Sequence, residues 1–124
     1  MRVNVSLGVT AIAVVLGVVA AGAHHSHGAY VDTFMDVQGV VKEVHLVVPH
    51  SWVYIEVKNP KGGEPEVWAL EATGRTGLER IGVTAMSVSV GDTVKARCHR
   101  LRDGSNGCLL GFITTANGEE KIFD

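Results

Sequence analysis

Alternation of hydrophobic and polar residues dominates the chain from position 37 onward. In the segment 52–58, Val53, Ile55 and Val57 share one face and are separated by residues that point the other way. A period of two is typical of an antiparallel strand with one buried face. Segments of this kind are separated by turn signals rich in Gly, Asn, Asp or Pro, and the pattern predicts strands at 37–48, 52–58, 66–71, 93–101, 108–115 and 121–123.

One segment breaks the alternation. Residues 73–82 predict one or two helical turns, with Thr76 as the N-cap and Gly82 as the C-terminal stop. Three strands, a short helix and further strands, in that order, are typical of the OB-fold, a five-stranded Greek-key barrel. We therefore expect an all-β domain, a small five- to six-stranded OB-like Greek-key barrel with one short helix between strands three and four. A plain β-sandwich or meander is the alternative.

The first 23 residues have the layout of a signal peptide. Arg2 precedes an apolar stretch that carries no charge up to residue 20, and the tripeptide 21–23 (Ala-Gly-Ala) suits signal peptidase. An uncleaved membrane anchor is the alternative, but glycines interrupt the apolar stretch and no basic cluster follows it. We expect cleavage after Ala23 or Gly22, a His-rich extended lead-in at 24–35, a barrel at 36–124, a location in the periplasm or outside the cell, and membrane contact only through the signal peptide.

Composition narrows the classes of partner. Removal of 23 from 124 residues leaves 101, and loss of Arg2 leaves 10 basic against 13 acidic side chains, a net charge of −3 with neutral histidines. That balance does not favour nucleic acid as a partner.

Cys98 and Cys108 are expected to form a disulfide, because exported cysteine pairs are usually oxidised. A metal or redox site is the weaker alternative for this pair, since the spacing is not Cys-x-x-Cys.

Three of the six histidines, His24, His25 and His27, lie at the expected mature N-terminus. Imidazole binds copper, zinc and nickel, and a free α-amine adds a second nitrogen donor. Cleavage before His24 lets the new α-amine and the ring of His24 chelate one ion. Cleavage before Ala23 makes His25 the third residue of the mature chain, and a histidine in third place suits square-planar coordination. Both outcomes favour Cu(II) over Zn(II) or Ni(II). A polar segment without function is the alternative.

Residues further along the chain add to this hypothesis. His50 follows Pro49 at the corner between two predicted strands and faces away from the core. The lead-in of about a dozen residues spans roughly 40 Å when extended, so the N-terminus can reach His50. A second surface, suited to a partner protein or small ligand, combines aromatic with basic residues: Trp52, Tyr54 and Trp68 with Lys95, Arg97 and His99. Ordinary packing and solvation are the alternatives for that surface.

Five short motifs follow one another in the chain: His-His-Ser at 24–26, Pro-His-Ser-Trp at 49–52, Trp-Ala-Leu-Glu at 68–71, Gly-Asp-Thr-Val at 91–94 and Arg-Asp-Gly-Ser at 102–105. In this order they resemble an uncharacterised family of small exported bacterial proteins, the domain of unknown function 6152. The resemblance covers essentially the whole mature chain and implies no activity. In the family the corner between the first two strands usually reads Asn-Pro-His-Val-Trp. In this chain Val48 replaces the asparagine and Ser51 replaces the valine. What the resemblance adds is a shared histidine at positions 24, 25 and 50.

Enzyme signatures are largely absent. Ser26 and Ser51 each follow a histidine directly, but neighbours on an extended chain point to opposite sides, which is not triad geometry. We name no catalytic residue and favour a non-catalytic protein. The first hypothesis is a periplasmic or secreted metal-binding protein, for copper, that uses the N-terminal histidines and His50. The alternative is a non-catalytic OB-type binding module that docks a partner protein or a small ligand.

Overall fold

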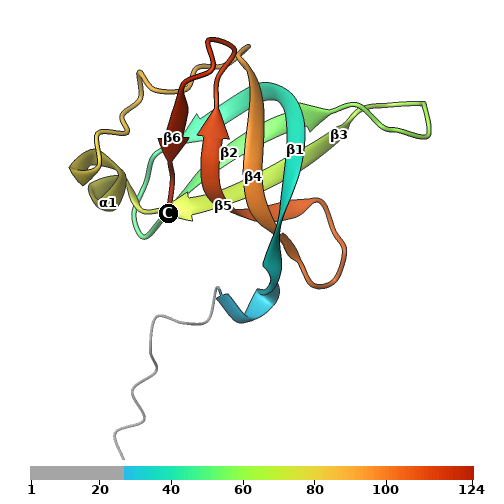
Figure 1. Cartoon of the computed structure of the whole chain (residues 1–124), viewed down its shortest axis with the longest axis horizontal. Coiled ribbons are helices and arrows are strands. Elements are labelled where there is room, and N and C mark those ends of the chain that lie inside the picture. Colours follow the sequence, from blue (N-terminus) through green and yellow to red (C-terminus); the bar gives the residue numbers. More distant parts are fainter. Residues whose placement is uncertain (1–26) are drawn as a thin grey trace, which may run out of the picture.

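Residues 27–124 are described by a computed structural model and form a closed β-barrel with one short helix (Figure 1). The predicted all-β, OB-like fold is confirmed, with the helix between the third and fourth strands. In chain order the elements are η1 (His27–Ala29), β1 (Tyr30–His45), β2 (His50–Val57), β3 (Glu66–Thr73), α1 (Arg75–Arg80), β4 (Thr93–Leu101), β5 (Gly107–Thr114) and β6 (Glu120–Ile122).

The strands follow the order β3-β2-β1-β4-β5-β6, and an additional pairing of β3 with β5 closes the barrel. That closing contact is parallel and joins Ala69 to Gly107, and Glu71 to Leu109, whereas the other pairs are antiparallel. Strand β1 has 16 residues, and it pairs with β4 through its first part and with β2 through its last part. Figure 1 shows β1 curving over the barrel between these two partners.

β1 begins earlier than the alternation predicts. The pattern indicates a strand only from residue 37, but Tyr30 already pairs with Leu101 of β4. The register is irregular between Tyr30 and Phe34, and Asp32 and Thr33, which lie in this stretch, are both exposed. Such an irregularity interrupts the period of two by which a strand is recognised in a sequence. Part of the expected lead-in segment is therefore strand.

The barrel core consists of the inward-facing residues of the strands. Val53, Ile55, Ala96 and Cys98 occupy inward positions, as their alternation predicts, and are completely buried. Phe123 follows β6 and is also buried; its carbonyl accepts a hydrogen bond from the amide of Thr73 on β3. The C-terminal residues thereby close the remaining gap beside β3.

The helix starts at a glycine, not at the expected threonine cap. Gly74 is the N-cap and offers no side-chain hydrogen bond, while Thr76 lies inside α1, so the expectation of a Thr76 cap is wrong. A Cβ at Gly74 would collide with the carbonyl of Pro49, which packs against the helix start. Gly82 ends the helix as predicted, with a φ of 83°. Nowhere in residues 27–124 is a helix both long and apolar enough to span a membrane.

The expected disulfide joins Cys98 of β4 to Cys108 of β5, with 5.5 Å between their Cα atoms. We expect the double variant Cys98→Ala, Cys108→Ala to lose about 3 kcal/mol of unfolding free energy, because the bridge restricts the unfolded chain. Urea unfolding measures this loss. The wild-type protein unfolded under reducing conditions is the control and should lose a similar amount. An unchanged urea midpoint in the double variant would contradict the prediction.

Candidate functional site

His50 is the first residue of β2 and is held in place by the corner before it. The amide of Arg75 donates a hydrogen bond to the carbonyl of Val47 at 2.9 Å, which joins this corner to the start of α1. The next residue, Ser51, is buried and its hydroxyl donates to the same carbonyl at 3.3 Å. The His50 side chain remains 45% exposed. The backbone therefore fixes where this imidazole leaves the barrel while solvent still reaches the ring.

A buried carboxylate lies beside His50. Glu71 on β3 pairs with Trp52 across the β2–β3 ladder, and only 7% of its surface is exposed. Nδ1 of His50 lies 3.1 Å from Oε1 of Glu71. A carboxylate at this distance favours a proton on Nδ1, so in the neutral ring Nε2 carries the lone pair that binds metals. This is the arrangement in which a histidine is prepared to act as a ligand.

Tyr30 forms a hydrogen bond with the second oxygen of the Glu71 carboxylate. It is the first residue of β1, is 6% exposed, and donates its hydroxyl hydrogen to Oε2 of Glu71. Burial raises the pKa of Tyr30 above its ordinary value, and the hydrogen bond to Glu71 and the charge of that carboxylate raise it further. We call Tyr30, Glu71 and His50 the Glu71 cluster. It joins β1, β3 and β2 on the outside of the barrel.

The sequence pattern did not identify Tyr30 or Glu71. Glu71 lies between the buried Leu70 and Ala72 on β3, at a position that alternation assigns to the outer face. Nothing local indicates that Tyr30, 41 residues earlier, would cover it. The available signal was the Trp-Ala-Leu-Glu motif at 68–71, in which an acidic residue ends an otherwise apolar segment.

The four predicted metal ligands are only partly covered by the structure. His24 and His25 lie outside the described residues, and His27 is the first residue of η1, three positions before Tyr30. Among the side chains that the structure describes, no three His, Cys, Asp or Glu residues are grouped so that they could hold a metal ion. A metal site at His50 therefore needs donors from beyond those side chains.

The predicted aromatic surface is smaller than expected. Trp52 and Tyr54 face outward on β2 with ring centroids 6.5 Å apart. Trp68 is instead buried in the core, where the guanidinium of Arg100 lies 5.1 Å from the centre of its ring. Its position on β3 has the inward parity, so Trp68 does not belong to an aromatic platform with the other two rings.

The predicted basic surface is interrupted by partners from β1. Lys95, Arg97 and His99 share the outer face of β4, as expected. Nε of Arg97 donates to Asp36 at 3.2 Å, and the His99 ring lies 4.1 Å from that of Phe34. Two of the three residues are thus occupied by contacts within the fold. The strip is not a continuous positive surface.

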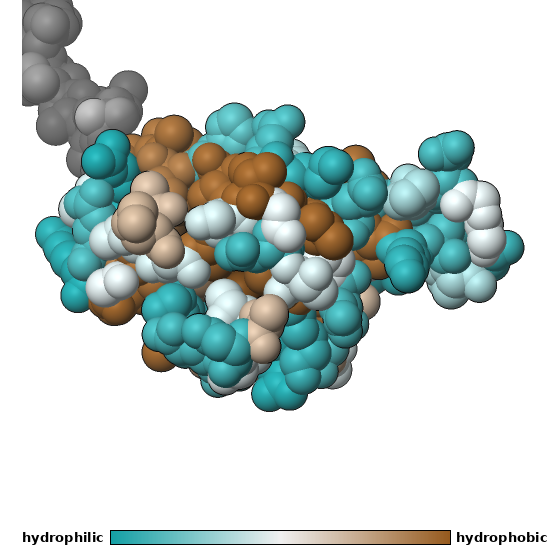
Figure 2. Space-filling model, turned by 90° about the horizontal axis from the view of Figure 1, so that it is seen from above, coloured by the Kyte–Doolittle hydropathy of each residue, from teal (hydrophilic) through white to brown (hydrophobic). Residues whose placement is uncertain are grey.

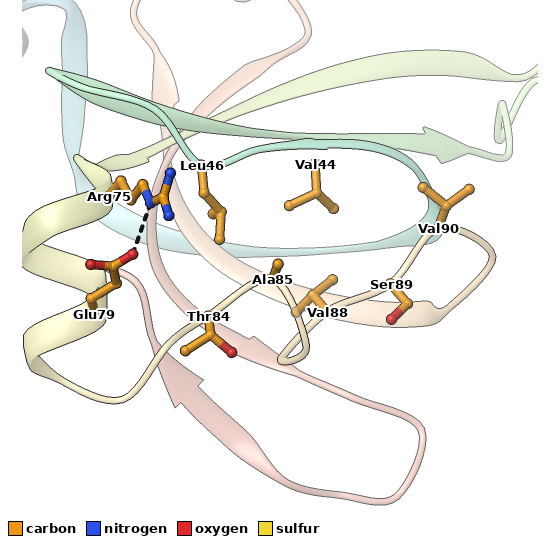
Figure 3. Close-up of a pocket in the computed structure, with 9 residues that line it drawn as sticks. All are labelled: Val44, Leu46, Arg75, Glu79, Thr84, Ala85, Val88, Ser89 and Val90. Atoms are coloured by element: carbon orange, nitrogen blue, oxygen red, sulfur yellow. Dashed lines mark hydrogen bonds and ion pairs between the residues drawn. The ribbon is translucent and has the colours of Figure 1, made fainter.

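A separate groove of about 640 Å³ lies between the end of β1, α1 and the loop that leads to β4 (Figure 3). Val44 and Leu46 point across it towards Val88, and the ion pair of Arg75 with Glu79, 2.8 Å between Nε and Oε1, closes one end. Figure 2 shows apolar side chains gathered on the upper face of the barrel, whereas the projecting β2–β3 turn is mainly hydrophilic. The groove contains no histidine and is distinct from the Glu71 cluster.

The chain matches the model of a family of unknown function, DUF6152, over residues 11–110. The chain belongs to this family. That membership confirms the family that the sequence resembles. No curated protein matches this DUF6152 chain.

Two crystal structures of the mitochondrial single-stranded DNA binding protein Rim1 from S. cerevisiae resemble the DUF6152 barrel. One has a TM-score of 0.52 at 10% identity and covers 68% of this chain and 93% of that chain. The selenomethionine form has a TM-score of 0.47 at 10% identity, with 67% and 92% covered. The first comparison confirms the OB-like fold, which is compatible with a binding module. The yeast protein binds single-stranded DNA, whereas we expect no nucleic acid partner for this chain. The disagreement is weak, because an identity of 10% shows a shared fold and not a shared partner.

The raised pKa of Tyr30 predicts that the folded protein loses stability at alkaline pH. The pKa of the Tyr30 hydroxyl is raised in the folded DUF6152 protein, so the folded state keeps the proton at a pH where the unfolded chain, with the ordinary value of 10.0, loses it. This contribution is complete below pH 10 and is lost as the pH rises through the folded value. We expect the unfolding free energy of the wild type to fall more steeply above pH 10 than that of Tyr30→Phe, as measured by urea unfolding. Tyr54→Phe is the control and should keep the wild-type slope; equal slopes for wild type and Tyr30→Phe would refute the prediction.

Proposed function

We propose that this DUF6152 protein is an exported copper-binding protein in which His50 and nitrogen donors of the mature N-terminus hold one Cu(II) ion. The observation that carries the proposal is the contact of His50 Nδ1 with the buried carboxylate of Glu71, while the ring stays open to solvent. In metal-binding histidines the ring nitrogen that does not bind the metal almost always has a partner, which is a carboxylate, a backbone carbonyl or a water.

Chain continuity supports the N-terminal donors. Tyr30 and His50 contact the two oxygens of one carboxylate, so the hydroxyl of Tyr30 lies close to the His50 ring. His27 is three residues from Tyr30 and His24 is six residues from it. Chain length keeps these two histidines within about 10 Å and about 20 Å of the Tyr30 backbone, respectively. This proximity to Tyr30 supports them as donors for an ion at His50.

The donor chemistry favours copper. Cys98 and Cys108 are joined in the disulfide, so the cysteines supply no thiolate and the proposed ligands are all nitrogen. Nitrogen donors bind Cu(II) more tightly than Zn(II) or Ni(II). Cleavage before His24 would supply an amine and imidazoles, and cleavage before Ala23 would supply an amine, backbone nitrogens and the imidazole of His25. In either case His50 would add one further imidazole. The protein would store, deliver or sense the metal.

A binding module that docks a partner protein is the second candidate. The outward stack of Trp52 on Tyr54, both half-buried, favours it, because aromatic rings often anchor protein interfaces. The stack lies on the same strand as His50, so a partner could dock beside a bound ion. Binding of a partner that survives a copper chelator but not Trp52→Ala would favour this function over metal binding.

Two histidine variants test the copper site. We expect His50→Ala to weaken Cu(II) binding by the secreted, processed protein at least about tenfold, because one ligand is lost. His45→Ala is the matched control, since His45 is an exposed histidine on the neighbouring strand whose Nε2 lies 2.7 Å from Glu43; its affinity should equal that of the wild type. Competition with a chromophoric chelator measures the affinity, and intact mass identifies the N-terminal residue. A processed wild-type protein that binds no copper, or equal affinity in His50→Ala, would contradict the proposal.

A further inference from the structure

We infer that Tyr30 is a positioning residue of the copper site: through Glu71 it sets the orientation of the His50 imidazole. This inference rests on the proposed function. It assigns a role in metal binding to a residue that supplies no ligand atom.

The Glu71 carboxylate is oriented by its partners. Rotation about the last bond of a glutamate side chain has only broad minima, so the plane of the carboxylate is set by its hydrogen bonds. Oε1 faces Nδ1 of His50, and Oε2 accepts the hydroxyl of Tyr30. A buried carboxylate oxygen without a donor is unfavourable. Loss of the Tyr30 hydroxyl therefore lets the carboxylate turn toward another donor or water, and the His50 ring loses a fixed ionic partner.

The N-terminal end of the barrel has further anchors that do not involve the Tyr30 hydroxyl. The amide of Arg102 donates to the carbonyl of Ala29 at 2.9 Å, and its Nε donates to the carbonyl of Gly28 at 3.1 Å. Residues 28 and 29 thus remain attached to the end of β4 when the hydroxyl is removed. The ring of Tyr30 is buried, and phenylalanine retains that ring. Tyr30→Phe therefore separates the orientation of His50 from the attachment of the N-terminal segment.

A carboxylate on the second nitrogen of a ligating histidine fixes the ring and raises its basicity, and its loss usually weakens metal binding about 10- to 100-fold. Tyr30→Phe keeps the carboxylate but releases it, so we expect the lower end of that range, about tenfold. The ring also becomes free to adopt several orientations relative to the ion. A broader distribution of Cu(II) hyperfine couplings follows, which loss of general stability would not produce.

The experiment adds Cu(II) alone to the secreted, processed wild type, to Tyr30→Phe and to Tyr54→Phe. Tyr54 is the matched control, because it lies on β2 with its ring stacked on Trp52. We expect one ion per chain in all three proteins, about tenfold weaker binding in Tyr30→Phe, and a heterogeneous Cu(II) electron paramagnetic resonance spectrum in that variant alone. Circular dichroism checks that each protein is folded.

A second variant keeps the inference testable if Tyr30→Phe does not fold. Glu71→Gln retains the shape of the side chain but removes the charged acceptor from His50, and it should show the same loss of affinity and the same spectral change. Wild-type affinity and spectrum in Tyr30→Phe, or in Glu71→Gln should the first not fold, overturn the inference and leave the copper site standing. A wild-type protein that binds no copper overturns the proposed function and the inference with it.

Discussion

The parallel pairing of β3 with β5 is the constraint on which the rest of this structure depends. It closes the barrel and places Glu71 opposite Leu109, with Trp52 on its other side. The start of β1 then lies over this junction, and Tyr30 covers the carboxylate. A residue that would otherwise be an ordinary surface acid becomes a buried carboxylate that accepts the Tyr30 hydroxyl and lies 3.1 Å from Nδ1 of His50. The orientation proposed for His50 follows from this closure.

The sequence predicted those elements whose signals are local. β2 and β4 lie within two residues of their predicted bounds, because each has one buried face and therefore a strict alternation. The first half of β1 was not recognised, because its register is irregular and exposed residues interrupt the pattern. The Thr76 cap was wrong because the close approach of Pro49 requires a glycine at position 74. That contact joins distant segments and leaves no local mark.

The candidate site divides in the same way. His50 could be selected from its corner position and its parity, which are local properties. Glu71 and Tyr30 could not, since the burial of an outward-facing residue depends on a segment far away in the chain. Trp68 shows the opposite error: its residue type suggested a surface platform, but its parity places it in the core. The roles proposed for His24 and His25 depend on the proposed cleavage of the signal peptide, which the fold does not determine.

Pulsed electron paramagnetic resonance of the Cu(II)-loaded, secreted protein tests most directly whether His50 binds the ion. An imidazole that binds Cu(II) through Nε2 produces echo modulation from its remote nitrogen Nδ1, and the depth of modulation reports how many imidazoles are bound. If His50 is a ligand, the spectrum of His50→Ala contains one imidazole fewer than that of the wild type. Identical modulation in the two proteins would show that the copper is held without His50.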